Sequence, residues 1–215
     1  MRHSPVIILG AGGHAKVLAD ILMLCDREVI GFVTPDREAG SLFYGQKVLG
    51  GDDVVFSYPV DSVDLVNGVG SLPGQVGRWR LAEMIRQRGR SFTSVFHPES
   101  VISADVEIGC GVQVMAGAVI QTGASIGRDS IINTGSIIDH DCIIAENCHI
   151  APGVTCSGGV EIEKNTHIGT GATLIQGLKI GEGCIVAAGS VVHKDIPDGM
   201  FYRKKLETIM VEVEA

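Results

Sequence analysis

An apolar side chain returns at every sixth position between Ile102 and Val192, and this period restricts the fold more than any other feature of the chain. Sixteen consecutive positions of this register are apolar, and all of them except Cys156 are Ile, Val or Leu. A period of six fits neither the turn of an α-helix nor the two-residue alternation of an open strand. Short fixed repeats are typical of solenoids, so the pattern predicts the stacked coils of a parallel β-helix.

The other positions of the repeat agree with a narrow solenoid. β-branched side chains at the inward position suit a crowded, pleated interior. The position four residues later is mostly small, as at Ala118, Ala124 and Ser136, which allows the corners between strands to close. Four glycines of the repeat are expected to adopt turn conformations that a Cβ disfavours: Gly109, Gly127, Gly169 and Gly181.

The composition of the 215 residues, of which 45% are apolar, indicates a globular chain. No apolar run approaches the roughly 18 residues of a membrane span, and the short apolar start does not form a signal peptide. The net charge of −8 gives no general attraction to nucleic acid or anionic membranes. Six cysteines include no Cys-x-x-Cys pair, and four of them lie at register positions of the repeat, so we expect small core residues in a reducing cytoplasm: Cys142, Cys148, Cys156 and Cys184.

The first part of the chain alternates apolar segments with helical patterns. Strands are predicted over residues 5–9, 29–33 and 63–69, helices from the glycine-rich turn to about Leu24 and over 77–88, and a loop over 40–53. This order predicts a small parallel sheet covered by helices. The predicted division is an α/β domain over 1–97, a β-helix over 98–196 and a C-terminal tail over 197–215.

Gly10, Gly12 and Ala15 follow the first strand with the spacing of a dinucleotide-binding turn. Glycine at such a turn lets the backbone of a helix N-terminus approach a phosphate. The acidic residue that would hold an NAD ribose is absent, because Thr34 ends the second strand and Asp36 follows two residues later. We therefore expect a nucleotide or nucleotide sugar rather than NAD, the alternative being a tight turn that needs glycine only for its geometry.

Two pairs of residues in the solenoid carry candidate chemistry. His140 lies two residues after the inward Ile138, near a corner, and the adjacent Asp141 would polarise its imidazole as a general base. An exposed surface histidine is the alternative. His149 and His167 are 18 residues apart and stack if a coil has three hexads, either as a metal pair or as a ladder. No third ligand has a suitable spacing, so we expect no metal.

Three motifs of the repeat resemble left-handed β-helix acetyltransferases: Asp139-His140-Asp141-Cys142, His149-Ile150-Ala151-Pro152-Gly153 and Ser157-Gly158-Gly159-Val160. The N-terminal Gly10-Ala11-Gly12-Gly13-His14-Ala15-Lys16-Val17 makes the resemblance narrower. It is similar to the NeuD/PglD type of bacterial sugar acetyltransferase, which joins a Rossmann-like nucleotide-sugar domain to a hexapeptide solenoid. The resemblance covers nearly the whole chain and implies left-handed coils of three hexads and a homotrimer.

The resemblance also implies roles for residues. His140 would take a proton from the sugar amine or hydroxyl as it attacks the acetyl thioester, and Asp141 would orient it. His149 would lie beside the acetyl group of acetyl-CoA, and the Gly158 amide would face the developing oxyanion. The remaining coenzyme contacts would be Thr170, Ala187 and Ala188, and the nucleotide-linked amino sugar would meet Gly10, Gly12, Gly13, His14 and Asp36.

His140 and His149 are nine residues apart, which is half of an 18-residue coil, so in one chain they face away from each other. We therefore predict active sites between subunits and an inactive monomer. Two departures from the family pattern stand out. Met200-Phe201-Tyr202-Arg203-Lys204 replaces the usual Gly-x-Pro-Ala-Lys stretch, and the acidic pair after the second strand is reduced to Asp36. The basic residues Arg203, Lys204 and Lys205 would meet coenzyme phosphates or form a solvated end.

These features together predict an acetyl-CoA-dependent N-acetyltransferase acting on the 4-amino group of a nucleotide-linked sugar. O-acetylation of sialic acid or a related sugar is the alternative within the class. A nucleotide-binding trimer without activity is an alternative outside it. A zinc enzyme of the solenoid carbonic-anhydrase type is disfavoured because its closely spaced histidine pair is missing.

Overall fold

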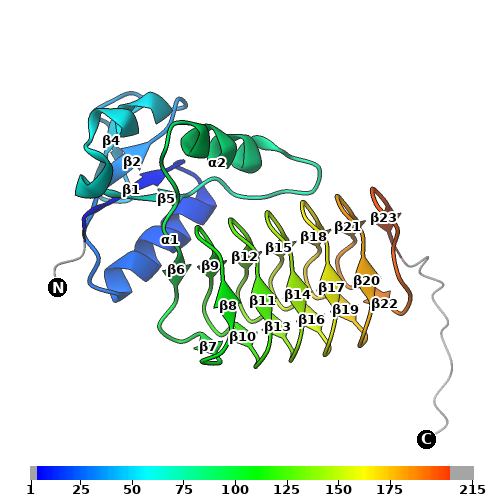
Figure 1. The fold of residues 1–215 in the computed structure, drawn as a ribbon. Coiled ribbons are helices and arrows are strands. Elements are labelled where there is room, and N and C mark those ends of the chain that lie inside the picture. Colours follow the sequence, from blue (N-terminus) through cyan, green and yellow to red (C-terminus); the bar gives the residue numbers. More distant parts are fainter. Residues whose placement is uncertain (1–3, 204–215) are drawn as a thin grey trace, which may run out of the picture.

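The computed structural model describes residues 4–203 and shows a small α/β domain beside a solenoid of short strands (Figure 1). Strands one coil apart pair in parallel, so that Ile120 lies opposite Ile138, and Ile138 lies opposite Cys156. Each partner is 18 residues from the next, and every coil contributes three strands. The predicted parallel β-helix of three hexads per coil is confirmed.

The strands of the solenoid form three faces of a prism, named here in chain order. The first face contains β6 (Val95–Phe96), β9 (Gln113–Val114), β12 (Ile131–Ile132), β15 (His149–Ile150), β18 (His167–Ile168), β21 (Ile185–Val186) and β23 (Phe201–Tyr202). The second face contains β7 (Val101–Ile102), β10 (Val119–Ile120), β13 (Ile137–Ile138), β16 (Thr155–Cys156), β19 (Thr173–Leu174) and β22 (Val191–Val192). The third face contains β8 (Glu107–Ile108), β11 (Ser125–Ile126), β14 (Ile143–Ile144), β17 (Glu161–Ile162) and β20 (Lys179–Ile180).

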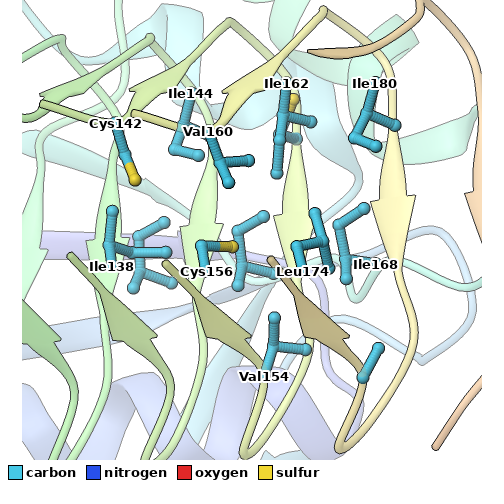
Figure 2. Close-up of a cluster of buried hydrophobic side chains, with 14 of the residues drawn as sticks. Ile138, Cys142, Ile144, Val154, Cys156, Val160, Ile162, Ile168, Leu174 and Ile180 are labelled. Carbon is cyan, nitrogen blue, oxygen red and sulfur yellow. The ribbon is translucent and has the colours of Figure 1, made fainter. Parts of the chain in front are cut away.

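The inward residues stack into one continuous core. Figure 2 shows Ile138, Cys156 and Leu174 pointing into the prism from successive coils, and all three are fully buried. Burying a side chain of this size contributes about 1.5–3 kcal/mol. Four cysteines are buried free thiols, as expected for small core residues: Cys142, Cys148, Cys156 and Cys184.

The corners correct one detail of the sequence analysis. Gly109, Gly127, Gly169 and Gly181 do not have positive φ angles; a Cβ at Gly127 would instead lie 2.4 Å from the Glu146 nitrogen of the next coil. Glycine is therefore required there by the close approach of backbone between coils. Positive φ occurs at other corner positions, which hold mostly glycine but also four residues with a side chain: Asp129, Asp141, Asn147 and Asn165.

The α/β domain contains one sheet with the order β3-β4-β2-β1-β5. Its parallel strands are β1 (Val6–Leu9), β2 (Val29–Val33), β4 (Gln46–Gly50) and β5 (Asp64–Asn67), and its helices are α1 (Gly13–Leu24) and α2 (Gly77–Gln87). The central β1 is buried on both sides: Val6 and Ile8 pack in the cluster of α1, whereas Ile7 and Leu9 pack in that of α2. Met115 and Ile131 of the solenoid extend the α1 cluster.

The predicted loop over 40–53 is wrong, because this segment contains a hairpin of β3 (Leu42–Phe43) and β4, followed by 3-10 turns over Asp52–Ser57 and Val60–Ser62. Tyr44 and Gly45 both have positive φ, as a two-residue hairpin turn requires. A Tyr-Gly pair is not a strong turn signal, so the sequence did not indicate this hairpin. Its antiparallel β3 makes the sheet mixed rather than purely parallel.

Six polar residues join the two parts of the molecule and are called here the junction network: His14, Asn67, Arg78, Arg86, Gln113 and Asp129. His14 Nε2 lies 2.7 Å from Gln113 Oε1, and the Gln113 amide donates to the Asn67 carbonyl at 2.8 Å. Arg86 of α2 forms an ion pair with the buried Asp129 carboxylate. Buried polar groups are costly unless they are paired, so these contacts specify how the domain sits on the solenoid.

Candidate active site

His140 and Asp141 occupy the corner between the second and third faces, after β13. His140 Nδ1 lies 2.9 Å from Asp141 Oδ2, and both side chains are exposed, by 59% and 72%. Because the carboxylate is the acceptor, the imidazole donates from Nδ1, which leaves Nε2 free toward solvent. The hydrogen bond to Asp141, helped by the charge of Asp139, raises the pKa of His140. This arrangement suits a group that accepts a proton from a bound molecule.

Asp141 adopts the left-handed conformation, with φ 59°, at a corner position where the neighbouring coils have Gly123 and Gly159. A side chain in this region is uncommon and costs roughly 1 kcal/mol. Such strain is typical of functional positions. Asp141 therefore places a carboxylate next to His140 at a corner position where glycine would fit the backbone better.

Gly158 lies one coil beyond His140, and a Cβ at Gly158 would lie 2.5 Å from His140 Cε1 and Nε2. The absence of a side chain therefore makes room for the imidazole. Among the described residues, no hydrogen-bond acceptor faces the Gly158 amide, whereas the next amide, of Gly159, donates to the His140 carbonyl at 2.9 Å. Gly158, whose amide the family resemblance assigned to the oxyanion, therefore lies beside His140.

His149 has a contrasting environment on the first face. Its Nδ1 lies 3.1 Å from the Ser71 carbonyl, and its Nε2 lies 3.1 Å from Asn133 Nδ2. The ring of His167 stacks against it edge to face, with centroids 4.7 Å apart, as the 18-residue spacing predicted. Burial lowers the pKa of His149 to about 3, with further contributions from His167 and His14. The imidazole is therefore neutral, with its proton on Nδ1, since the Ser71 carbonyl can only accept.

A groove of about 350 Å³ runs beside His149 between the first face and residues 71–73. Thr170, Ala187 and Ala188 line this groove together with His149, so four of the five predicted coenzyme residues come together. Phe201 of β23 lines its far end. The segment that replaces the usual Gly-x-Pro-Ala-Lys stretch of the family thus forms β23, and its Phe201 is part of the groove wall. Lys204 and Lys205 lie outside the described residues. We call this space the thioester groove.

A second cleft of about 370 Å³ opens at the N-terminus of α1 and the carboxyl ends of the strands. Gly10, Gly12 and Asp36 line it, joined by Asp52, which sequence reasoning missed. A Cβ at Gly12 would meet nothing within 4 Å, so glycine there leaves free space and is not required by packing. Free backbone at a helix N-terminus suits a phosphate. This space is called here the nucleotide cleft.

His14 and Gly13 are not among the residues that line the nucleotide cleft. The His14 side chain is instead bound to Gln113 of the solenoid, and burial together with the charge of Arg78 lowers its pKa to about 4. Asn133 and Ser71, the partners of His149, were not predicted either. Ser71 lies 78 residues from His149, and no spacing of residue types indicates that contact. Asn133 lies 16 residues from His149 and directly follows the strand of the previous coil that pairs with β15, so the 18-residue period could have indicated it.

Residues 5–84 match the family described as the PglD N-terminal domain, and residues 105–194 match bacterial transferase hexapeptide repeats. The perosamine N-acetyltransferase of Caulobacter crescentus, solved with CoA and GDP-perosamine, is 35% identical, with 92% of each chain covered and a TM-score of 0.85. The chain belongs to the NeuD/PglD type of bacterial sugar acetyltransferases. The predicted fold class, with its left-handed β-helix, is thereby confirmed.

Two other solved structures show the same similarity. The acetyltransferase domain of PglB from Neisseria gonorrhoeae, solved with acetyl coenzyme A, is 33% identical with a TM-score of 0.85, covering 93% of this chain and 96% of that one. WeeI from Acinetobacter baumannii is 27% identical with a TM-score of 0.82, covering 92% and 95%. No curated protein sequence matches the chain closely enough to count as a relative.

Within residues 4–203, no three His, Cys, Asp or Glu side chains come together in a group that would bind a metal ion. Neither helix of that same part is long and apolar enough to cross a membrane.

Proposed function

We propose that this sugar acetyltransferase uses acetyl-CoA to acetylate the 4-amino group of a nucleotide-linked amino sugar, as a homotrimer in the cytoplasm. The observation that carries the proposal is the exposed His140–Asp141 pair, with Nδ1 bound and Nε2 free. The thioester groove and the nucleotide cleft supply two separate binding spaces on the same chain. The similar enzymes with known ligands bind CoA with GDP-perosamine, and acetyl coenzyme A.

In the proposed reaction the sugar amine attacks the acetyl carbonyl, a C–N bond forms, and the C–S bond to the coenzyme breaks. His140 Nε2 takes the proton from the attacking nitrogen and passes it to the departing thiolate. Asp141 holds the imidazole and stabilises its protonated form. The amide of Gly158, which lies beside His140 and has no hydrogen-bond acceptor among the described residues, would bind the oxyanion of the tetrahedral intermediate.

Direct attack is favoured over an acyl-enzyme because the nearest thiol is unsuitable as a nucleophile. Cys142 follows Asp141 but is fully buried, and burial raises the pKa of its thiol. A thiol attacks as the thiolate, and raising the pKa removes that form at neutral pH. Acetyl-CoA therefore serves as a substrate that reacts directly with the sugar.

The trimer is supported by the residues that the second face presents to the outside. Its outward column contains the exposed apolar residues Val101, Ile137 and Val191. If three second faces surround a threefold axis, the corner of one chain that contains His140 meets the neighbouring chain along the corner after β15, next to His149. His140 and Gly158 of one chain would then complete the thioester groove of the next.

Mixing two inactive chains tests this shared site. Co-expressed His140→Asn and His149→Ala chains assemble at random, and roughly one quarter of the interfaces then contain both wild-type histidines. We expect about a quarter of wild-type activity, against nearly none for either variant alone. If both histidines served a site within one chain, no mixture would recover activity, because no chain carries both.

Release of the CoA thiol in the presence of nucleotide-4-amino sugars tests the function itself. We expect one member of a panel of UDP-, GDP- and dTDP-linked sugars to be acetylated, with a stoichiometric amount of thiol released. Acetylation of sialic acid hydroxyls instead would select the alternative within the class. If no acceptor caused release of the thiol, the result would favour the alternative of a nucleotide-binding trimer without enzymatic activity.

A further inference from the structure

One short segment of the chain forms a wall of both binding spaces. Residues 68–76, called here the strap, connect β5 to α2 and run out over the first face of the solenoid (Figure 1). Residues 68–70 line the nucleotide cleft, and the next three, 71–73, line the thioester groove. These two triplets are consecutive, so the backbone of one wall continues directly into the other.

The root of the strap is held firmly by Arg78 of α2. Its guanidinium donates to the carbonyl of Asn67 at 2.9 Å and to that of Val69 at 2.8 Å, and it reaches the Asp129 carbonyl of the solenoid at 3.5 Å. Arg78 is only 2% exposed. One planar side chain therefore fixes the end of β5, the wall of the nucleotide cleft and a corner of the solenoid relative to one another.

The outer part of the strap is held more weakly. Within the described residues, 71–76 make one hydrogen bond to the solenoid, from His149 Nδ1 to the Ser71 carbonyl, and one internal bond, from the Gln75 amide to the Leu72 carbonyl. Leu72 is 61% exposed. Few contacts and high exposure are typical of segments that shift at low cost. A contact that fixes this part of the strap would also fix the Ser71 carbonyl bound to His149 and residues 71–73 of the thioester groove wall.

We propose that the strap couples the two substrate sites, with Arg78 as the positioning residue that transmits the effect. A nucleoside diphosphate in the nucleotide cleft holds residues 68–70, which sets Ser71 and prepares the thioester groove for the coenzyme. The identities of the two ligands rest on the proposed function. Coupling between two sites is reciprocal, so the coenzyme tightens the nucleotide by the same factor.

Calorimetric titration of the full chain tests the coupling without any substitution. The dissociation constant of CoA is measured with and without saturating GDP or UDP, whichever binds, and that of the nucleotide with and without saturating CoA. We expect both constants to fall by the same factor, on the order of fivefold. If both ligands bind but neither changes the dissociation constant of the other, the coupling is overturned and the proposed function stands. Failure of CoA to bind would refute the function itself.

Arg78→Lys tests the positioning role, because lysine keeps the charge but not the planar fork. We expect the coupling factor to fall toward one. Arg90→Lys is the matched control: Arg90 is also buried and binds carbonyls, including those of Val55 and Val63, but it contacts no residue of the strap. An equal loss of coupling in Arg90→Lys would contradict the role of Arg78 and indicate a general effect of domain stability.

Trp79 provides a second, independent measurement in the wild-type chain. It is the only tryptophan, and it lies with residues 71–72 and 74–76 around a small pocket that is separate from the nucleotide cleft. We expect GDP or UDP to change its emission, although the nucleotide does not touch it. Unchanged emission at saturating nucleotide would show that the strap does not respond and would overturn the proposal.

Discussion

The same side chain has opposite properties at two places nine residues apart. His140, on an exposed corner beside a carboxylate, has a raised pKa and a free Nε2. His149, on the first face beneath the strap, has both nitrogens bound and a pKa lowered to about 3. The comparison shows that residue type does not decide the environment: His140 has the free nitrogen and raised pKa that the proposed base requires, whereas His149 is neutral and holds the Ser71 carbonyl.

Substitution of His140 should give the largest effect. His140→Asn removes the base, so we expect turnover to fall by about 10²- to 10⁴-fold, the usual contribution of general base catalysis. The melting temperature should hardly change, because the side chain is exposed. His193→Asn, at another exposed position, is the control and should keep full activity. A nearly normal rate in His140→Asn would contradict the assignment of the base.

Asp141→Gly should have the next largest effect. Glycine already stands at the equivalent corner of the coils on either side, so this substitution removes the carboxylate without straining the turn. We expect activity to fall by about 10- to 100-fold, and the acid limb of the pH–rate profile to move to lower pH, since the pKa of His140 is no longer raised. Asn165→Gly, at another left-handed corner, controls for the change of backbone. An acid limb that stays in place would show that Asp141 does not act through His140.

The pH dependence of stability, and not of the rate, should be set by the buried histidines. His14 and His149 have pKa values lowered to about 4 and about 3, so between pH 4 and 6.5 the unfolded chain binds protons that the folded chain does not. The free energy of unfolding should therefore decrease as the pH falls through this window, by roughly 1.4 kcal/mol per pH unit for each histidine. Urea denaturation at several pH values measures this slope.

Measuring the same pH dependence in two variants tests whether the environments of His140 and His149 differ as described. His149→Gln should lose its share of the acid slope, because glutamine fills similar space without titrating. His140→Asn should retain the slope, since His140 is exposed in the folded chain. A slope that disappears in His140→Asn and persists in His149→Gln would reverse the two assigned environments.

The sequence by itself determined the solenoid, because each coil must place a similar residue above the one before it, and this demand is visible as a period of six. It also placed His140 near a corner, and the three hexads per coil that the family resemblance implied then predicted that His140 and His149 face away from each other. Four residues that the family resemblance assigned to the coenzyme line one groove; of these, Thr170 and Ala188 lie 18 residues apart, at the same position of successive coils.

Only the tertiary structure decided what surrounds these residues. The carbonyl of Ser71 reaches His149, and Gln113 binds His14, across contacts of 78 and 99 residues in sequence. Such contacts depend on how the α/β domain docks on the first face, which no local pattern encodes. The side-chain partners, the protonation of the histidines and the strap shared by both sites therefore arise from packing between domains, where distance in space is independent of distance along the chain.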